Sequence, residues 1–150
     1  MIVISACLAG IACRYDGNDN FIAKIQELIE KEETVLICPE VLGGLPTPRT
    51  PAEIVGGNGD DVLDGKAKVI DRNGNDVTEI FIAGAYEALR QIQDVNPTCI
   101  ILKERSPSCG SSVIYSGEFN GNKQVGYGVT TALFRRHDFT VISEEDFVKQ

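Results

Sequence analysis

Positive charge is scarce in this sequence of 150 residues. It has 14 Lys and Arg residues against 22 Asp and Glu residues, which gives a net charge of -8 at pH 7. Proteins that wrap nucleic acid or bind anionic membranes need clustered Lys and Arg side chains. The composition therefore argues against nucleic acid and membrane partners, and a small molecule or another protein is the better expectation.

The basic start and long apolar run of a signal peptide are absent from the first residues, so we expect a cytoplasmic protein. The sequence has no internal repeat, low-complexity tract or linker, and a chain of this length can bury a core without added cross-links. With 43% hydrophobic and 24% charged residues, the composition is that of a soluble globular protein. We therefore expect one domain over residues 1–150.

Histidine is nearly absent, and closely spaced cysteine pairs are missing. The one histidine, His137, falls within a predicted helix, and no C-x-x-C pair is present, although the chain has five cysteines. An odd number of cysteines without export features argues against a disulfide framework and favours reduced thiols. The cysteines are thus candidates for metal binding or catalysis.

Short apolar runs alternate with helical patterns along the chain. The runs predict four buried strands, and the 3.6-residue periodicity predicts helices between them. Asp19 or Asn20 is a possible cap for the first helix, Asp76 with Glu79 resembles a capping box for the second, and Asn96-Pro97 ends that helix. The predicted strands cover residues 2–5, 34–37, 99–102 and 140–143, and the predicted helices cover 21–33, 76–95, 129–139 and 144–149, the last capped by Ser143.

This alternation predicts an α/β fold: an open, mainly parallel four-stranded sheet with helices on both faces, a Rossmann-like or flavodoxin-like three-layer α/β/α arrangement. We expect the strand order 2-1-3-4. Residues 62–71 resemble a small β-hairpin that turns near Asp64-Gly65, and residues 103–128 form a long polar loop of the kind that often carries function.

Three cysteines are predicted to meet at one edge of this sheet. Cys7 and Cys38 follow the first two strands, and Cys109 lies in the loop after the third. In open α/β sheets, ligands bind beyond the carboxyl ends of the strands. The thiols are open to four interpretations: buried packing residues, a zinc site, an iron–sulfur cluster, or a thiol nucleophile. Spacing alone does not choose between them, although packing is preferred for Cys99 inside its strand.

Several polar residues are predicted at the same edge. Glu40, in "CPE", is placed for proton transfer, and its alternative is a solvated loop acid. Arg49 either binds a carboxylate or phosphate of the substrate or pairs with Asp16 or Glu53. The Ser108 and Gly110 neighbours of Cys109 belong to a loop whose backbone N–H groups could cradle an anion. A structural role is favoured for the remaining groups: an Arg14–Asp16 ion pair beside Tyr15, with its turn at Gly17, and Glu144 in the first turn of the last helix.

Four stretches together resemble the thiouracil desulfurase family across the whole chain: "SACLAGIACRYDG", "CPEVLGGLPTPRTPAEI", "ILKERSPSCGSSVIYSGEF" and "GYGVTTALF". The resemblance implies an enzyme with a [4Fe-4S] cluster that is held by three cysteines, with an open iron that takes sulfur from a thiocarbonyl. The implied ligands are Cys7, Cys38 and Cys109. Glu40 would be the acid/base, Ser106 a hydrogen-bond partner of substrate or water, and Cys13 would not be a ligand.

We therefore expect non-redox, hydrolytic removal of sulfur from a small thiolated base or nucleoside such as thiouracil, with Arg49, Ser108 and Gly110 as candidate substrate-binding residues. Loops 58–75 and 115–127 would form the pocket walls. A cluster of this kind can be lost from protein prepared in air. Two alternatives stay open: a zinc- or thiol-dependent hydrolase of another heterocycle, and a non-enzymatic sulfur carrier or ligand-binding module.

Overall fold

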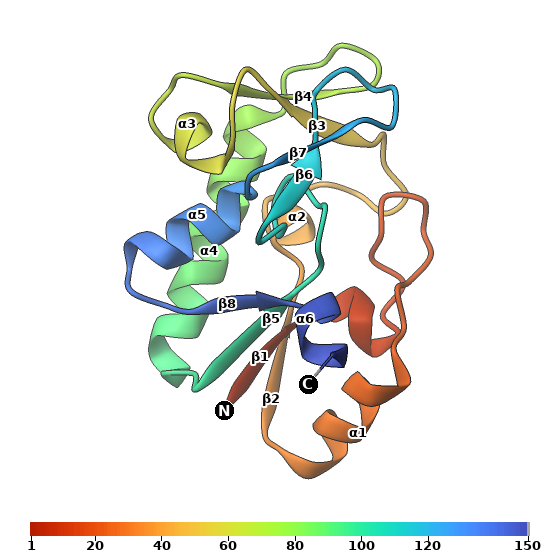
Figure 1. Cartoon of the computed structure of the whole chain (residues 1–150), viewed down its shortest axis with the longest axis vertical. Coiled ribbons are helices and arrows are strands. Elements are labelled where there is room, and N and C mark those ends of the chain that lie inside the picture. The colour runs from red at the N-terminus through yellow and green to blue at the C-terminus, as the bar shows by residue number, and fades with distance from the viewer. Residues whose placement is uncertain (150) are drawn as a thin grey trace.

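The computed structural model describes residues 1–149 and contains a central sheet of four parallel strands (Figure 1). The sheet consists of β2 (Thr34–Ile37), β1 (Ile2–Ser5), β5 (Cys99–Leu102) and β8 (Val141–Ser143), in that order. Val3 pairs with Val35 on one side and with Ile100 on the other. The observed order β2-β1-β5-β8 confirms the predicted order of the four strands.

Helices and two antiparallel ribbons surround the sheet. The helices are η1 (Ala6–Ala9), α1 (Ala23–Lys31), α2 (Pro39–Leu42), α3 (Gly59–Leu63), α4 (Thr78–Val95), α5 (Val129–Arg136) and α6 (Glu144–Val148). The ribbons pair β3 (Ala52–Val55) with β4 (Lys68–Asp71) and β6 (Val113–Tyr115) with β7 (Lys123–Val125). No helix within residues 1–149 is long and apolar enough to cross a membrane.

The two faces of the sheet bury separate apolar clusters. Val3 and Ile100 pack on one side with residues of α4 and α5, including Phe81. Ile4 and Ile101 pack on the other side with α1, and Phe147 of α6 joins them. Because successive strand residues point to opposite faces, a continuous apolar run supplies both clusters. The helices therefore cover both faces, which confirms the predicted three-layer α/β/α arrangement (Figure 1).

Two predicted helix starts are wrong in detail. The backbone N–H of Phe21 donates to Asp19, 2.8 Å away, and Ile22 rather than Asp19 or Asn20 precedes the first turn of α1. At α4, Asp76 accepts hydrogen bonds from the N–H and hydroxyl of Thr78, so no capping box forms and the helix begins two residues later than expected. These aspartates close short local turns instead, which is a common alternative for Asp.

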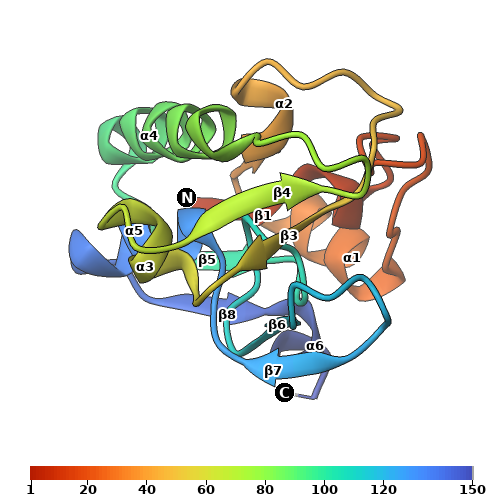
Figure 2. The same ribbon diagram turned by 90° about the horizontal axis from the view of Figure 1, so that it is seen from above.

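The predicted hairpin over residues 62–71 is also wrong. Asn58 accepts hydrogen bonds from the N–H groups of Asp60 and Asp61, and this cap starts helix α3 inside that segment. Strand β4 pairs instead with the earlier strand β3, with Ala52 opposite Asp71. The second ribbon, β6–β7, lies within the stretch predicted to be a polar loop. Both ribbons lie beyond the carboxyl ends of β1 and β5 (Figures 1 and 2).

Candidate active site

A cavity of about 530 Å³ opens at the carboxyl ends of β1, β2 and β5. Four thiols line it, those of Cys7, Cys13, Cys38 and Cys109, and none of them is in a disulfide. The structure thus brings the three predicted cysteines together at one edge of the sheet and adds Cys13 to them. Cys99 stands apart, packed against the second apolar cluster, as predicted for a strand residue.

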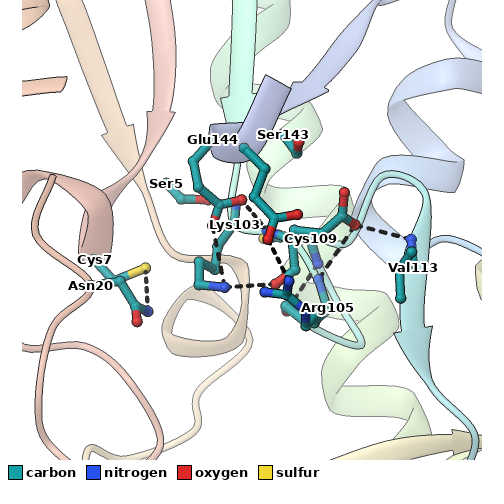
Figure 3. A network of polar contacts seen from close by, with 12 residues as sticks. Ser5, Cys7, Asn20, Lys103, Arg105, Cys109, Val113, Ser143 and Glu144 are labelled. Atoms are coloured by element: carbon teal, nitrogen blue, oxygen red, sulfur yellow. Dashed lines mark hydrogen bonds and ion pairs between the residues drawn. The ribbon is translucent and has the colours of Figure 1, made fainter. Parts of the chain in front are cut away.

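Cys7 lies in η1, directly after β1 and close to Asn20. The Asn20 side chain donates to the Cys7 sulfur at 3.4 Å (Figure 3), and its backbone N–H donates to the Cys7 carbonyl at 2.9 Å. Hydrogen bonding with Cys13 lowers the pKa of Cys7, burial opposes this, and the Asn20 contact lowers it further. Cys7 is therefore held in a polar setting that favours its thiolate.

Cys38 is the residue between β2 and α2, and Pro39 begins the helix after it. Helix α2 packs very closely on α4. A Cβ atom added at Gly84 of α4 would lie only 2.0 Å from the Pro39 carbonyl oxygen. This contact fixes the direction in which Cys38 leaves the sheet. Hydrogen bonding with Cys13 outweighs burial and lowers the pKa of Cys38 to about 7, which favours the thiolate form of this side chain.

Cys109 is held by the first turn of α5. The N–H groups of Val129 and Thr130 donate to the carbonyls of Pro107 and Ser108, and the Thr131 hydroxyl donates to the Cys109 carbonyl at 2.9 Å. These bonds satisfy donors that a helix start leaves unpaired. Burial raises the pKa of Cys109, and the nearby Cys38 and Glu40 raise it further. A neutral buried thiol is the expected state until a cation binds it.

Sequence reasoning missed Glu104, whose carboxylate organises the loop around Cys109. It is 2% exposed and accepts hydrogen bonds from the backbone N–H groups and hydroxyls of Ser111 and Ser112 and from the N–H of Val113, with distances of 2.8 to 3.1 Å. Burial alone would raise the pKa of Glu104, but these bonds lower it to about 2.

Residues 111–113 of this loop surround a carboxylate of the protein itself, whereas the N–H groups of Ser108 and Gly110 donate to Ser106, so binding of a substrate anion by the loop stays a prediction. The signal available in the sequence was the run of small polar residues after Cys109, which presents successive N–H groups to one acceptor. Nothing in the local sequence showed that the acceptor would be Glu104.

Glu40, Arg49 and Ser106 form a hydrogen-bonded group that lines the cavity. Arg49 Nε lies 3.2 Å from Glu40 Oε1, and the Ser106 hydroxyl lies 3.4 Å from Glu40 Oε2. Both the Asp16 and the Glu53 pairings predicted for Arg49 are wrong, since its guanidinium bonds Glu40 and the Cys13 carbonyl, the latter at 2.9 Å. Glu40 is thus fixed within the cavity between the Ser106 hydroxyl and the Arg49 guanidinium.

Ser106 also shapes the turn that carries Cys109, because its hydroxyl accepts hydrogen bonds from the N–H groups of Ser108 and Cys109, both at 3.0 Å. The Ser108 hydroxyl is buried against that of Thr130 at 2.7 Å. A Cβ at Gly110 would lie 2.9 Å from the Ser106 carbonyl oxygen, so only glycine fits there without a shift. In the part of the chain that the structure describes, the cavity walls include Ser106 but not Ser108 or Gly110.

The structural roles expected for the remaining rim residues are observed. Arg14 pairs with Asp16 at 3.4 Å and lies over the Tyr15 ring, and Gly17 has the left-handed backbone of the turn. Glu144 is buried, accepts a hydrogen bond from the Glu104 N–H at 2.7 Å and pairs with Lys103 at 3.2 Å (Figure 3). This network joins the end of β5 to α6.

Both loops that the sequence singled out contribute residues to the cavity lining. Arg72 belongs to the first, and Tyr115, Phe119 and Gly121 belong to the second. Tyr15 lines the cavity as well. Three aromatic residues therefore line the same cavity as the four thiols.

The donor set of the cavity is rich in thiols. Thiolates are the ligands that soft metals and iron–sulfur clusters prefer. Within residues 1–149, no group of three or more His, Cys, Asp or Glu side chains is arranged to hold one metal ion. Thiolates of a cluster each bind a different iron, so they do not have to converge on one point.

The fold and cavity define a class: α/β proteins with a thiol-lined site at the carboxyl edge of a parallel sheet, next to a carboxylate–hydroxyl pair. Residues 2–146 match the model of the 2-thiouracil desulfurase family. The chain belongs to this family, as its resemblance in sequence had indicated.

Two known proteins are similar to this chain over nearly its whole length. The chain is 49% identical over 146 residues to YbbK of Bacillus subtilis (strain 168), a protein described as uncharacterized, and the match covers 97% of each chain. It is also similar to the solved structure of a [4Fe-4S]-dependent thiouracil desulfidase, TudS, with 42% identity and a TM-score of 0.86, covering 99% of this chain and 93% of the other.

Proposed function

We propose that this protein is a [4Fe-4S]-dependent desulfidase that converts a thiolated pyrimidine such as thiouracil to the corresponding oxo base by non-redox hydrolysis. The observation that carries the proposal is the cavity in which Cys7, Cys38 and Cys109 lie beside the Glu40–Ser106 pair. Family membership and the likeness to the TudS desulfidase support it. The net charge of -8 favours a free base or nucleoside over intact nucleic acid.

Cys7, Cys38 and Cys109 would hold the cluster. When bound, it supplies a soft Lewis acid that binds the thiocarbonyl sulfur and polarises the carbon–sulfur bond. Two of these thiols have lowered pKa values, which favours the thiolate form that a metal needs. Cys13 is expected to stay protonated and to act as a hydrogen-bond partner, because its hydrogen bonds with Cys38 and Cys7 raise its pKa.

Glu40 is the proposed acid/base. It accepts a proton from water as the water oxygen adds to the carbon that carries sulfur, and the proton is then available to the ring nitrogen or the departing sulfur. Water supplies the new carbonyl oxygen, sulfur leaves as hydrosulfide, and no electrons are exchanged. The Ser106 hydroxyl donates to Glu40, 3.4 Å away, and accepts hydrogen bonds from the N–H groups of Ser108 and Cys109, so the predicted hydrogen bond from Ser106 to substrate or water would replace one of these contacts.

Arg49 supports this chemistry by holding Glu40. Its side chain is 5% exposed and its donors bond Glu40, Cys13, Pro46 and Thr47. Direct contact between Arg49 and substrate stays a prediction, as does contact with Ser108 and Gly110, whose positions packing already explains. We expect Arg49 to position the Glu40 carboxylate rather than to bind the pyrimidine.

Anaerobic reconstitution with iron and sulfide tests the proposal. We expect a brown protein with four irons that releases hydrosulfide from thiouracil and forms uracil, and we expect Cys7→Ala, Cys38→Ala and Cys109→Ala each to abolish the cluster. Cys99→Ala is the matched control, since Cys99 lies in β5 outside the cavity. A colourless protein that retains stoichiometric zinc and hydrolyses a different heterocycle would contradict the proposal, as would tight binding without turnover.

A further inference from the structure

Phe119 has a backbone conformation that bulky residues rarely adopt. It lies in the loop between β6 and β7 with a φ of 54°, in the left-handed region that favours glycine. A large side chain there costs free energy, and such residues persist where the surrounding structure holds them. Glycine adopts such a φ more easily than phenylalanine does, and the surrounding sequence "SGEFNGN" contains glycines at positions 117 and 121 but not at 119.

A buried carboxylate holds Phe119 in this conformation. Glu53 Oε1, from strand β3, accepts hydrogen bonds from the N–H groups of Gly117 at 2.9 Å and Phe119 at 3.3 Å. Glu53 itself is 9% exposed and lines the cavity. The loop is pressed against β3, since a Cβ at Gly117 would lie 2.5 Å from the Ile54 carbonyl oxygen. The position of Phe119 is therefore fixed by contacts from a distant part of the chain.

These contacts keep the Phe119 ring at the cavity. Phe119 lines the cavity together with Tyr115 and Tyr15. Tyr15 already lies against the Arg14 guanidinium. Phe119 takes part in no ring–ring or cation–π contact with any of residues 1–149. An aromatic side chain is thus held in a costly conformation at a cavity wall without a ring partner of its own.

We propose that Phe119 is a specificity-determining residue that stacks on the planar heterocycle of the substrate, and that Glu53 is the positioning residue that presents it. The inference rests on the proposed function, because a pyrimidine ring is the partner that a fixed aromatic face recognises. Stacking between a base and an aromatic side chain does not depend on which exocyclic groups the base carries. Phe119 would therefore select flat rings, and the choice of the thiocarbonyl would rest on the thiols that line the same cavity.

Four variants of Phe119 test the proposal in the reconstituted protein. We expect Phe119→Ala and Phe119→Gly to raise KM for thiouracil about tenfold, Phe119→Leu to raise it less, and Phe119→Tyr to leave it near the wild-type value. The value of kcat is expected to change little. Because glycine accepts a positive φ, Phe119→Gly is expected to unfold at a higher temperature than Phe119→Ala while binding substrate equally poorly. A merely structural residue would not separate stability from KM in this way.

Glu53→Ala is expected to raise KM as Phe119→Ala does, and Glu53→Gln, which keeps an oxygen acceptor, to raise it less. Tyr86→Ala is the control, because Tyr86 is an exposed aromatic residue of α4, 53% exposed, outside the cavity. Wild-type KM in folded Phe119→Ala and Phe119→Gly proteins would overturn the proposal.

Calorimetric titration with uracil separates this inference from the proposed function. If wild-type protein releases no hydrosulfide from thiouracil, the proposed function fails, and uracil binding still reports on Phe119. Weaker uracil binding by Phe119→Ala than by the wild type and Tyr86→Ala supports stacking. Equal binding by all three proteins refutes it whether or not the protein desulfurates thiouracil.

Discussion

Replacing Glu104 with glutamine should destabilise the protein strongly at neutral pH. The Glu104 carboxylate accepts five hydrogen bonds of 3.1 Å or less within the loop that carries Cys109, and glutamine keeps one oxygen while turning an NH₂ group toward N–H and O–H donors. Buried donors that lose their acceptor are costly. A pKa lowered from 4.5 to about 2 corresponds to about 3 kcal/mol of stability from the ionised form.

The contribution of Glu104 has a defined pH dependence. The pKa in the folded protein lies below that of the unfolded chain, so the stabilisation is fully present above about pH 4.5 and is lost as pH falls toward about 2. Urea unfolding of wild-type and Glu104→Gln proteins should therefore differ by about 3 kcal/mol at pH 7. The difference should shrink steadily between about pH 4.5 and 2.

Glu30→Gln is the matched control, because Glu30 is exposed on α1 and accepts a single long hydrogen bond from Gln26. It should leave the free energy of unfolding unchanged. Equal urea midpoints for Glu104→Gln and wild type at pH 7 would refute the reasoning, and so would a difference between them that does not depend on pH. Because the same loop carries Cys109, we also expect the reconstituted Glu104→Gln protein to lose iron faster than the wild type.

Three further predictions concern the site. Glu40→Gln should keep the cluster absorbance and lower kcat by about 10²- to 10⁴-fold, as measured by hydrosulfide release; an unchanged kcat would exclude the acid/base role. Arg49→Met should lower kcat because Glu40 loses its ion-pair partner, whereas Arg136→Met, which breaks an ion pair on α5 outside the cavity, should not. Cys13→Ala should retain iron at the wild-type ratio, because Cys13 is not a proposed ligand. Iron loss as complete as in Cys7→Ala would show that Cys13 is a cluster ligand.

The sequence predicted the sheet well because the relevant signals are local. The apolar runs of β1 and β5 point to buried strands, and the crossover helices between them enforce parallel strands. The end of α4 at Asn96 was equally readable, since Pro97 disfavours a helical residue before it. These features depend on neighbours within a few residues.

The ribbons were not predictable in the same way. Strand β4 was recognised as extended, but its partner β3 lies across a helix that begins at the Asn58 cap. Pairing between strands that are far apart in sequence depends on which surfaces the rest of the fold brings together. The backbone of Phe119 has the same origin, because the acceptor that holds it, Glu53, is 66 residues away.

At the site, the sequence by itself determined the residue types and their placement at strand ends. It placed Cys7 and Cys38 after adjacent strands and Cys109 in the following loop, because parallel strands deliver their carboxyl ends to one edge. Only the tertiary structure decided which polar groups meet: Arg49 with Glu40, and Glu104 with the backbone of residues 111–113. Hydrogen bonds and ion pairs act over a few ångströms, so their partners follow from packing that brings distant segments together.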